Sequence, residues 1–169
     1  MKIFNFLALL FLLITLSYCS PQSPPATAEG AIDGVSVSVE YSSPRLRGRQ
    51  GKIWGDMLPY GEVWRAGANA ATEVTFEQPV MVEGESLPAG TYSLFMIPGE
   101  ETWTVIFNEA TGISGTEYES VKDQNALEVS ADPRKNPELR EDLNYQITNG
   151  ALELHWEYLT IPIKIEAQG

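Results

Sequence analysis

The stretch LNYQITNGALELHWEY, residues 143–158, decides the fold class of this chain. Apolar and polar residues alternate through it on both sides of Asn149-Gly150. The apolar residues expected on one face are Leu143, Tyr145, Ile147, Leu152, Leu154, Trp156 and Tyr158. Asn and Gly both tolerate the positive φ that a type I′ turn needs, so the stretch predicts a β-hairpin of two half-buried strands.

The same alternation recurs through the rest of the chain. Further strands are expected within residues 35–41, 72–76, 80–82, 91–97, 103–107, 127–131 and 161–165. A turn at 98–101 predicts a second hairpin, whereas 108–125 predicts a long loop or a loop with one helical turn. About eight or nine strands with little helix predict an all-β fold, an antiparallel β-sandwich or a jelly-roll-like barrel.

The N-terminal residues predict export. Lys2 precedes an apolar run from Ile3 to Leu16, and Cys19 follows, as in the signal peptide of a lipoprotein. We expect a signal peptide at 1–18, a lipidated Cys19, a Pro/Ser-rich tether at 19–31 and a single domain at 32–169. Tyr18 stands where such cleavage sites usually carry Gly, Ala or Ser, so a plain secreted protein or an uncleaved anchor remains an alternative.

Composition excludes several functions. The formal net charge of −12 opposes binding to nucleic acids and to anionic lipid surfaces, so no nucleic-acid partner is expected and membrane contact would come through the N-terminal lipid. Cys19 is the only cysteine, which excludes an intrachain disulfide and a cysteine-based zinc site. Walker, dinucleotide, calcium-loop and Gly-x-Ser-x-Gly motifs are absent from the sequence, so we expect no cofactor and no metal.

His155 is the only histidine and lies between Glu153 and Glu157 in the strand pattern. Two neighbouring carboxylates could tune its pKa or join it in binding a metal ion. The alternation with Leu154 and Trp156 alone predicts an exposed polar face, and this simpler interpretation is preferred.

The candidate site is the irregular segment LPYGEVWRAGAN, residues 58–69. Its recognition-type side chains are Tyr60, Glu62, Trp64, Arg65 and Asn69, with Arg45 as a possible neighbour. An aromatic face beside a planar cation and an amide suits sugar rings, carboxylates or peptide backbones. The alternative is structural: the tryptophan packs in the interior, the arginine caps carbonyl groups, and Glu62 pairs with Arg65.

Four blocks carry a resemblance to a known family. They are VEYSSPR at 39–45, YGEVWRAGAN at 60–69, LPAGTYSLF at 87–95 and WTVIFN at 103–108. In this order they resemble the domain of unknown function (DUF) 2911 family, whose members are typical of Bacteroidetes-type bacteria and often carry signal peptides. The resemblance implies the fold and an envelope location, and it implies no catalytic residues.

Three functional hypotheses follow. The leading one is a lipid-anchored β-sandwich of the cell envelope, facing the periplasm or the cell surface, that binds a glycan or a peptide through the candidate site. The second is a carboxylate-dependent hydrolase that uses Glu62 and another acid. The third is a structural module of an envelope assembly, which predicts an exposed apolar patch or a bare sheet edge.

Overall fold

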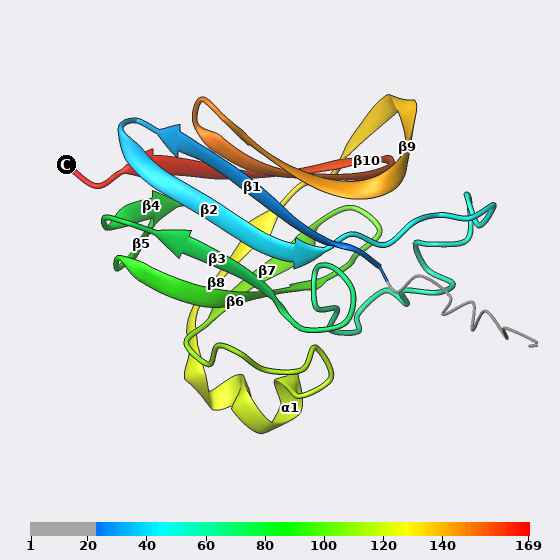
Figure 1. Ribbon diagram of the computed structural model, residues 1–169, viewed down its shortest axis with the longest axis horizontal. Helices are drawn as coiled ribbons and strands as arrows, with labels where there is room; N and C mark the ends of the chain where they lie inside the picture. Colours follow the sequence, from blue (N-terminus) through cyan, green and yellow to red (C-terminus); the bar gives the residue numbers. More distant parts are fainter. Residues whose placement is uncertain (1–22) are drawn as a thin grey trace, which may run out of the picture.

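The computed structural model describes residues 23–169, where ten strands form two antiparallel sheets (Figure 1). This confirms the predicted all-β sandwich, with ten strands in place of eight or nine. The expected signal peptide and Cys19 lie outside the described residues. No helix between residues 23 and 169 is long and apolar enough to cross a membrane.

The larger sheet has six strands in the order β1-β2-β3-β6-β7-β8. Their bounds are β1 Pro25–Ile32, β2 Val35–Ser42, β3 Thr72–Phe76, β6 Gly90–Ile97, β7 Trp103–Asn108 and β8 Asn125–Ala131. The predicted hairpin of 91–97 and 103–107 is confirmed as β6 and β7. Val39 pairs with Val74, and Val74 with Tyr92, so apolar side chains stack in rows that face the core.

The smaller sheet has the order β5-β4-β10-β9. Its strands are β4 Val80–Val82, β5 Glu85–Leu87, β9 Arg134–Thr148 and β10 Ala151–Ala167. Thr148 pairs with Ala151 around Asn149-Gly150, which confirms the hairpin expected there. The region 108–125 holds one short helix, α1 Tyr118–Val121, and a 3-10 turn, η1 Lys122–Gln124, as expected for a loop with a helical turn.

The tether prediction is wrong for its second half. Residues from Pro25 onward form β1, which pairs with β2 over its whole length, from Pro25 opposite Ser42 to Ile32 opposite Val35. Backbone hydrogen bonds order this stretch, and they do not require the apolar side chains whose scarcity suggested a flexible tether. A Cβ at Gly30 would lie 2.9 Å from Ile147 Cγ2 of β9, so β1 packs closely against the second sheet.

The prediction of a separate last strand at 161–165 is also wrong, because these residues continue β10. β9 begins at Arg134, well before Leu143, where the predicted hairpin begins. The break in the pattern lies inside β10 at Glu157, whose φ is +56°, and the register against β9 shifts on both sides of it. Ile165 N donates to Gly150 O at 2.9 Å, so the end of β10 lies beside its beginning.

Aromatic side chains fill both ends of the core. Phe76 and Phe107 are fully buried, and Phe76 lies opposite Gly90 at the start of β6. Tryptophans fill the other end, where Trp103 is fully buried and Trp64 and Trp156 keep only 6% and 4% of their surface exposed. The irregular segment 43–71 closes this end of the sandwich, where the chain enters at Pro25 (Figure 1). The recognition-type side chains of the candidate site therefore lie on a segment that packs against this end of the core.

Candidate functional site

The segment 58–69 is irregular but firmly attached to β6. Trp64 and Met96 exchange two backbone hydrogen bonds, of 2.7 and 2.8 Å, and Gly61 N donates to Pro98 O at 2.9 Å. These bonds hold the segment at the end of β6 and fix the direction in which each of its side chains points.

Trp64 does not offer a stacking face to a ligand. Its Nε1 donates to Gly67 O at 3.0 Å, and its ring stacks on Trp156 with centroids 6.1 Å apart and planes 19° apart. With 6% of its surface exposed, the indole is part of the core. The expectation that a sugar stacks on Trp64 is therefore wrong. Burial of the apolar ring between the sheets is favoured in free energy over its exposure to water.

Trp54 is the accessible member of a cluster of four tryptophans. Its ring centroid lies 4.9 Å from that of Trp103, 5.7 Å from that of Trp156 and 5.8 Å from that of Trp64. Unlike the other three, Trp54 is only half-buried, and it lines an open hollow. The cluster thus orients one tryptophan at the surface by packing it on three in the interior.

Arg65 takes the structural role of a carbonyl cap. Its Nη1 donates to Asn69 O at 2.8 Å, and its half-buried side chain lies over Gly115, where a Cβ would be 2.1 Å from Arg65 Cδ. Within residues 23–169 no ion pair joins Glu62 to Arg65, contrary to the pairing that the structural alternative included.

Glu62, Trp64 and Arg65 line one hollow of about 580 Å³, together with Glu119 of α1. Glu62 is exposed, and Glu119 is exposed and pairs with Lys122 at 2.9 Å. A glycoside hydrolase needs one acid whose pKa is raised by an apolar surrounding. Two solvated carboxylates do not supply that environment, so this hollow lends no support to the hydrolase hypothesis.

Arg45 and Asn69 line a different hollow, of about 370 Å³. Arg45 Nε pairs with Asp142 at 2.7 Å, and Asn69 Nδ2 donates to Ser23 O at 3.2 Å. Tyr60 points into a third hollow. The six predicted residues therefore do not form one site, because the rigid segment directs neighbouring side chains to opposite sides.

The third hollow is a groove of about 840 Å³, which we call the aromatic groove. Its aromatic walls are Trp54, Tyr60, Trp103 and Tyr158, and its polar walls are Glu100, Glu101, Lys135, Asn136 and Glu157. Tyr60 and Tyr158 are 43% and 46% exposed, so two phenol rings border the groove beside the edge of an indole. This is the composition expected of a ligand site: flat apolar surfaces with a few convergent polar groups.

The groove is assembled from the segment 43–71, the turn between β6 and β7, the start of β9 and the bend in β10. Gly51 N donates to the buried carboxylate Oε1 of Glu157, which ties the loop bearing Trp54 to β10 beside Tyr158. Gly55 has φ +85°, and an added Cβ would come within 3.0 Å of the Tyr60 ring, so the missing side chain leaves room for that ring. No group of three or more His, Cys, Asp or Glu side chains that could hold a metal ion occurs in residues 23–169.

The family model described as "Protein of unknown function (DUF2911)" matches residues 23–165. The chain belongs to the DUF2911 family. The matched range begins two residues before β1 and includes every residue of the aromatic groove, so the groove is part of the DUF2911 domain itself. Comparison with curated proteins and with solved structures found no match.

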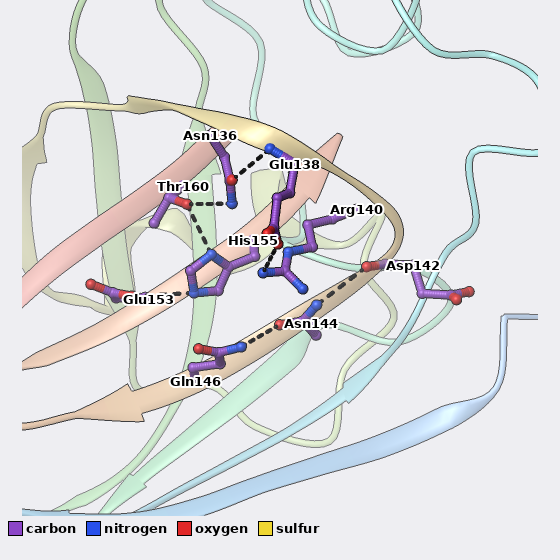
Figure 2. Close-up of polar contacts among 9 residues, drawn as sticks. All are labelled: Asn136, Glu138, Arg140, Asp142, Asn144, Gln146, Glu153, His155 and Thr160. Atoms are coloured by element: carbon purple, nitrogen blue, oxygen red, sulfur yellow. Dashed lines mark hydrogen bonds and ion pairs between the residues drawn. The ribbon is translucent and has the colours of Figure 1, made fainter. Parts of the chain in front are cut away.

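A second polar cluster of this DUF2911 protein surrounds His155 on β9 and β10 (Figure 2). The histidine was expected on an exposed face, but only 7% of it is exposed. Nδ1 lies 2.8 Å from Thr160 Oγ1, and Nε2 lies 3.2 Å from the Glu153 carboxylate without hydrogen-bond alignment. The bend in β10 lies between His155 and Thr160, and the Thr160 hydroxyl contacts the imidazole across it.

The pKa of His155 is lowered, chiefly because burial disfavours the charged imidazolium. The carboxylate of Glu153 opposes this shift, and the Arg140 guanidinium adds to it. Arg140 in turn pairs with Glu138 at 3.1 Å. Asn136 Nδ2 of β9 donates to Thr160 Oγ1 of β10 at 3.5 Å, so this cluster links the two strands of the hairpin. Among residues 23–169, no group of three or more His, Cys, Asp or Glu that could hold a metal ion includes His155.

Sequence reasoning missed Trp54, Tyr158, Lys135 and Asn136 of the groove. Tyr158 was assigned to the core face with Trp156, and the break at Glu157 turned it outward. Trp54 lies in an irregular stretch without periodicity. The one available signal was the composition of this stretch. Gly51 and Gly55 lie on either side of Trp54 and predict turns that would leave it at the surface.

Proposed function

We propose that this DUF2911 protein is an exported, lipid-anchored module of the cell envelope that binds a glycan in the aromatic groove. The observation that carries the proposal is the grouping of Trp54, Tyr60 and Tyr158 around one hollow of about 840 Å³. Sugar rings present flat C–H faces that pack on aromatic rings, while amide, ammonium and carboxylate groups bind the hydroxyls at their edges.

Charge narrows the class of glycan. Three of the groove's side chains are acidic, at Glu100, Glu101 and Glu157, against the single cation Lys135. The whole chain carries −12, so an anionic polysaccharide would be repelled at long range as well as in the groove. The groove therefore favours neutral or amino-substituted sugars over uronic or sulfated ones.

The test is glycan-array binding by the purified protein and its Tyr60→Ala/Tyr158→Ala variant. Both rings are half in water, so their removal is expected to leave the melting temperature within about 2 °C while binding to neutral glycans falls at least about tenfold. Val63→Ala serves as the matched control, because Val63 is an exposed apolar residue of the same segment outside the groove.

Unchanged binding by the folded double variant would refute the groove as the glycan site. Binding to an array of extended peptides, with none to glycans, would favour the peptide alternative. Equal loss in Val63→Ala would show that the segment's fold, and not the two rings, is responsible.

The envelope location rests on the N-terminal sequence. The apolar run ending at Leu16 and the lone Cys19 support cleavage and lipidation, and β1 begins only six positions after that cysteine. Mass spectrometry of the mature N-terminus is expected to show a diacylglycerol thioether on Cys19. An unmodified cysteine, or an N-terminus elsewhere, would rule out the anchor and leave the groove proposal standing.

A further inference from the structure

A strongly basic loop lies where the folded domain begins. Residues 42–55 contain no acid and hold four of the eleven cations of the chain: Arg45, Arg47, Arg49 and Lys52. We call residues 45–52 the basic loop. In a chain with a formal charge of −12, this concentration of one sign on one loop sets that end of the molecule apart.

The basic loop is tied to the point where the chain enters the domain. Ser43 N donates to Pro24 O at 2.8 Å, and Ser23 and Pro24 line a hollow together with Arg45, Arg47 and Arg49. Figure 1 shows the start of β1 beside this cyan loop, with the C-terminus at the opposite end of the sandwich.

The loop has a defined shape. Arg49 caps it from within, donating from Nε to Leu46 O and from Nη2 to Arg45 O, and Leu46 is fully buried. The outward cations Arg45, Arg47 and Lys52 are exposed. Arg45 pairs with Asp142, the Glu141 carboxylate accepts a hydrogen bond from Arg47 N, and the Glu157 carboxylate accepts one from Gly51 N, so three acids contact a loop that carries four cations.

We propose that the basic loop docks on the anionic phospholipid headgroups of the membrane that holds the N-terminal lipid, and so sets the orientation of the domain. This proposal rests on the lipid anchor of the proposed function. Fully extended, the chain from Cys19 to Pro25 spans at most about 20 Å, and a domain of this size has a radius of gyration of about 15 Å. The anchor therefore keeps the entry end, with its basic loop, nearest the headgroups.

The acidic remainder does not prevent this docking. Electrostatic interactions are screened over a Debye length of about 8 Å at physiological salt. The membrane charge therefore interacts much more strongly with the loop that faces it than with the distant acids. Each lysine or arginine near an anionic surface is attracted to it, whereas the negative remainder is repelled. Both effects turn the same end of the molecule toward the lipid.

The proposed orientation also determines where the aromatic groove lies relative to the membrane. The groove is lined by Trp54, which directly follows the basic loop, and by Glu157, which binds Gly51 of that loop. Docking would thus immobilise one wall of the groove close to the membrane surface, where envelope glycans are attached or exported.

The test uses the full lipidated protein in vesicles and a fluorophore on a single introduced cysteine. Cys19 is the only native cysteine, and its sulfur is blocked by the lipid, so Gln50→Cys labels the basic loop alone and Gln168→Cys labels the opposite end. Lipids with a nitroxide on the headgroup report proximity by quenching.

With about one-third phosphatidylglycerol in phosphatidylcholine, the label at 50 is expected to be quenched several-fold more than the label at 168. This difference should shrink to the smaller one that the anchor alone imposes, both in pure phosphatidylcholine and when NaCl rises from about 0.05 to about 0.5 M. Arg47→Glu/Lys52→Glu should reduce the difference to that smaller value, whereas the control Lys122→Glu/Lys164→Glu, with the same change in net charge on η1 and β10, should retain it in full.

Equal quenching at both positions in anionic vesicles, or full retention in Arg47→Glu/Lys52→Glu, would overturn the docking surface and leave the anchor intact. A protein that does not incorporate and whose mass shows no lipid on Cys19 would overturn the anchor and the orientation with it. Neither result bears on glycan binding by the groove, which is measured separately.

Discussion

At Glu157 and Tyr158, one backbone angle determines which of two neighbouring side chains is buried and which is exposed. Glu157 adopts φ +56°, its carboxylate turns inward to accept Gly51 N, and only 4% of the residue is exposed. Tyr158, which strict alternation would place in the core, is 46% exposed in the aromatic groove. A single residue in the left-handed region thus places the Glu157 side chain in the interior and the Tyr158 side chain at the surface.

His155 gives a prediction at the same scale. Because burial lowers its folded-state pKa below the unfolded value of about 6.5, its contribution to stability is fully present above that value and is lost as pH falls through the folded pKa. The wild-type free energy of unfolding should therefore decrease more between pH 7.5 and pH 5 than that of His155→Gln. Urea titrations at both pH values measure the difference.

The comparison with His155→Gln is needed because the many carboxylates also begin to titrate near pH 5. Those that face His155 are Glu153 directly and Glu138 through Arg140. Both remain in the variant, so the two proteins differ only in the group at position 155. The same pH dependence in the two proteins would show that His155 does not titrate in this range.

Among the elements, β1 and β9 decide how the sandwich closes. Both are outer strands of their sheets, and each would expose a row of unpaired backbone groups. Gly30 of β1 lies against Ile147 of β9. The close approach of these two edges leaves little of the bare edge that the structural-module hypothesis predicts on that side.

A double-mutant cycle tests this contact. Gly30→Ala places a methyl group 2.9 Å from Ile147 Cγ2 and 3.0 Å from its Cβ, so we expect it to destabilise the protein by about 1–3 kcal/mol. In an Ile147→Ala background the same change should cost less than in the wild type, because Cγ2 is gone and only the Cβ at 3.0 Å remains. Equal costs in both backgrounds, measured by urea unfolding, would show that the two strands do not constrain each other.

At the scale of the whole molecule, the tryptophans and the basic loop lie at one end. The four tryptophans, the basic loop and the entry of the chain all lie in or beside the segment that closes the sandwich. The exposed large apolar side chains are Met57, Tyr60, Val63, Leu139 and Tyr158. Three of the five belong to that same segment, which supports recognition at this end of the domain.

The fold class was predictable because strand alternation and turn chemistry are local properties. Asn149-Gly150 identified its hairpin, and the runs around Val39, Val74 and Leu94 identified strands whose apolar rows face the core. The order β1-β2-β3-β6-β7-β8 was not predictable, because it depends on which edges meet in space. β1 itself was missed because its pairing relies on backbone groups and small side chains.

The amino-acid sequence by itself determined the all-β sandwich, its main hairpins and the family, since period-two patterning and turn residues act within a few positions. Only the tertiary structure decided the site. It buried Trp64, left Trp54 half-buried and Tyr158 exposed, and divided Tyr60, Arg65 and Arg45 among three hollows. The physical reason is that the exposure of a side chain depends on packing between distant segments. The position of Trp54, for example, is set by the three other tryptophans that it contacts, and not by its neighbours in the chain.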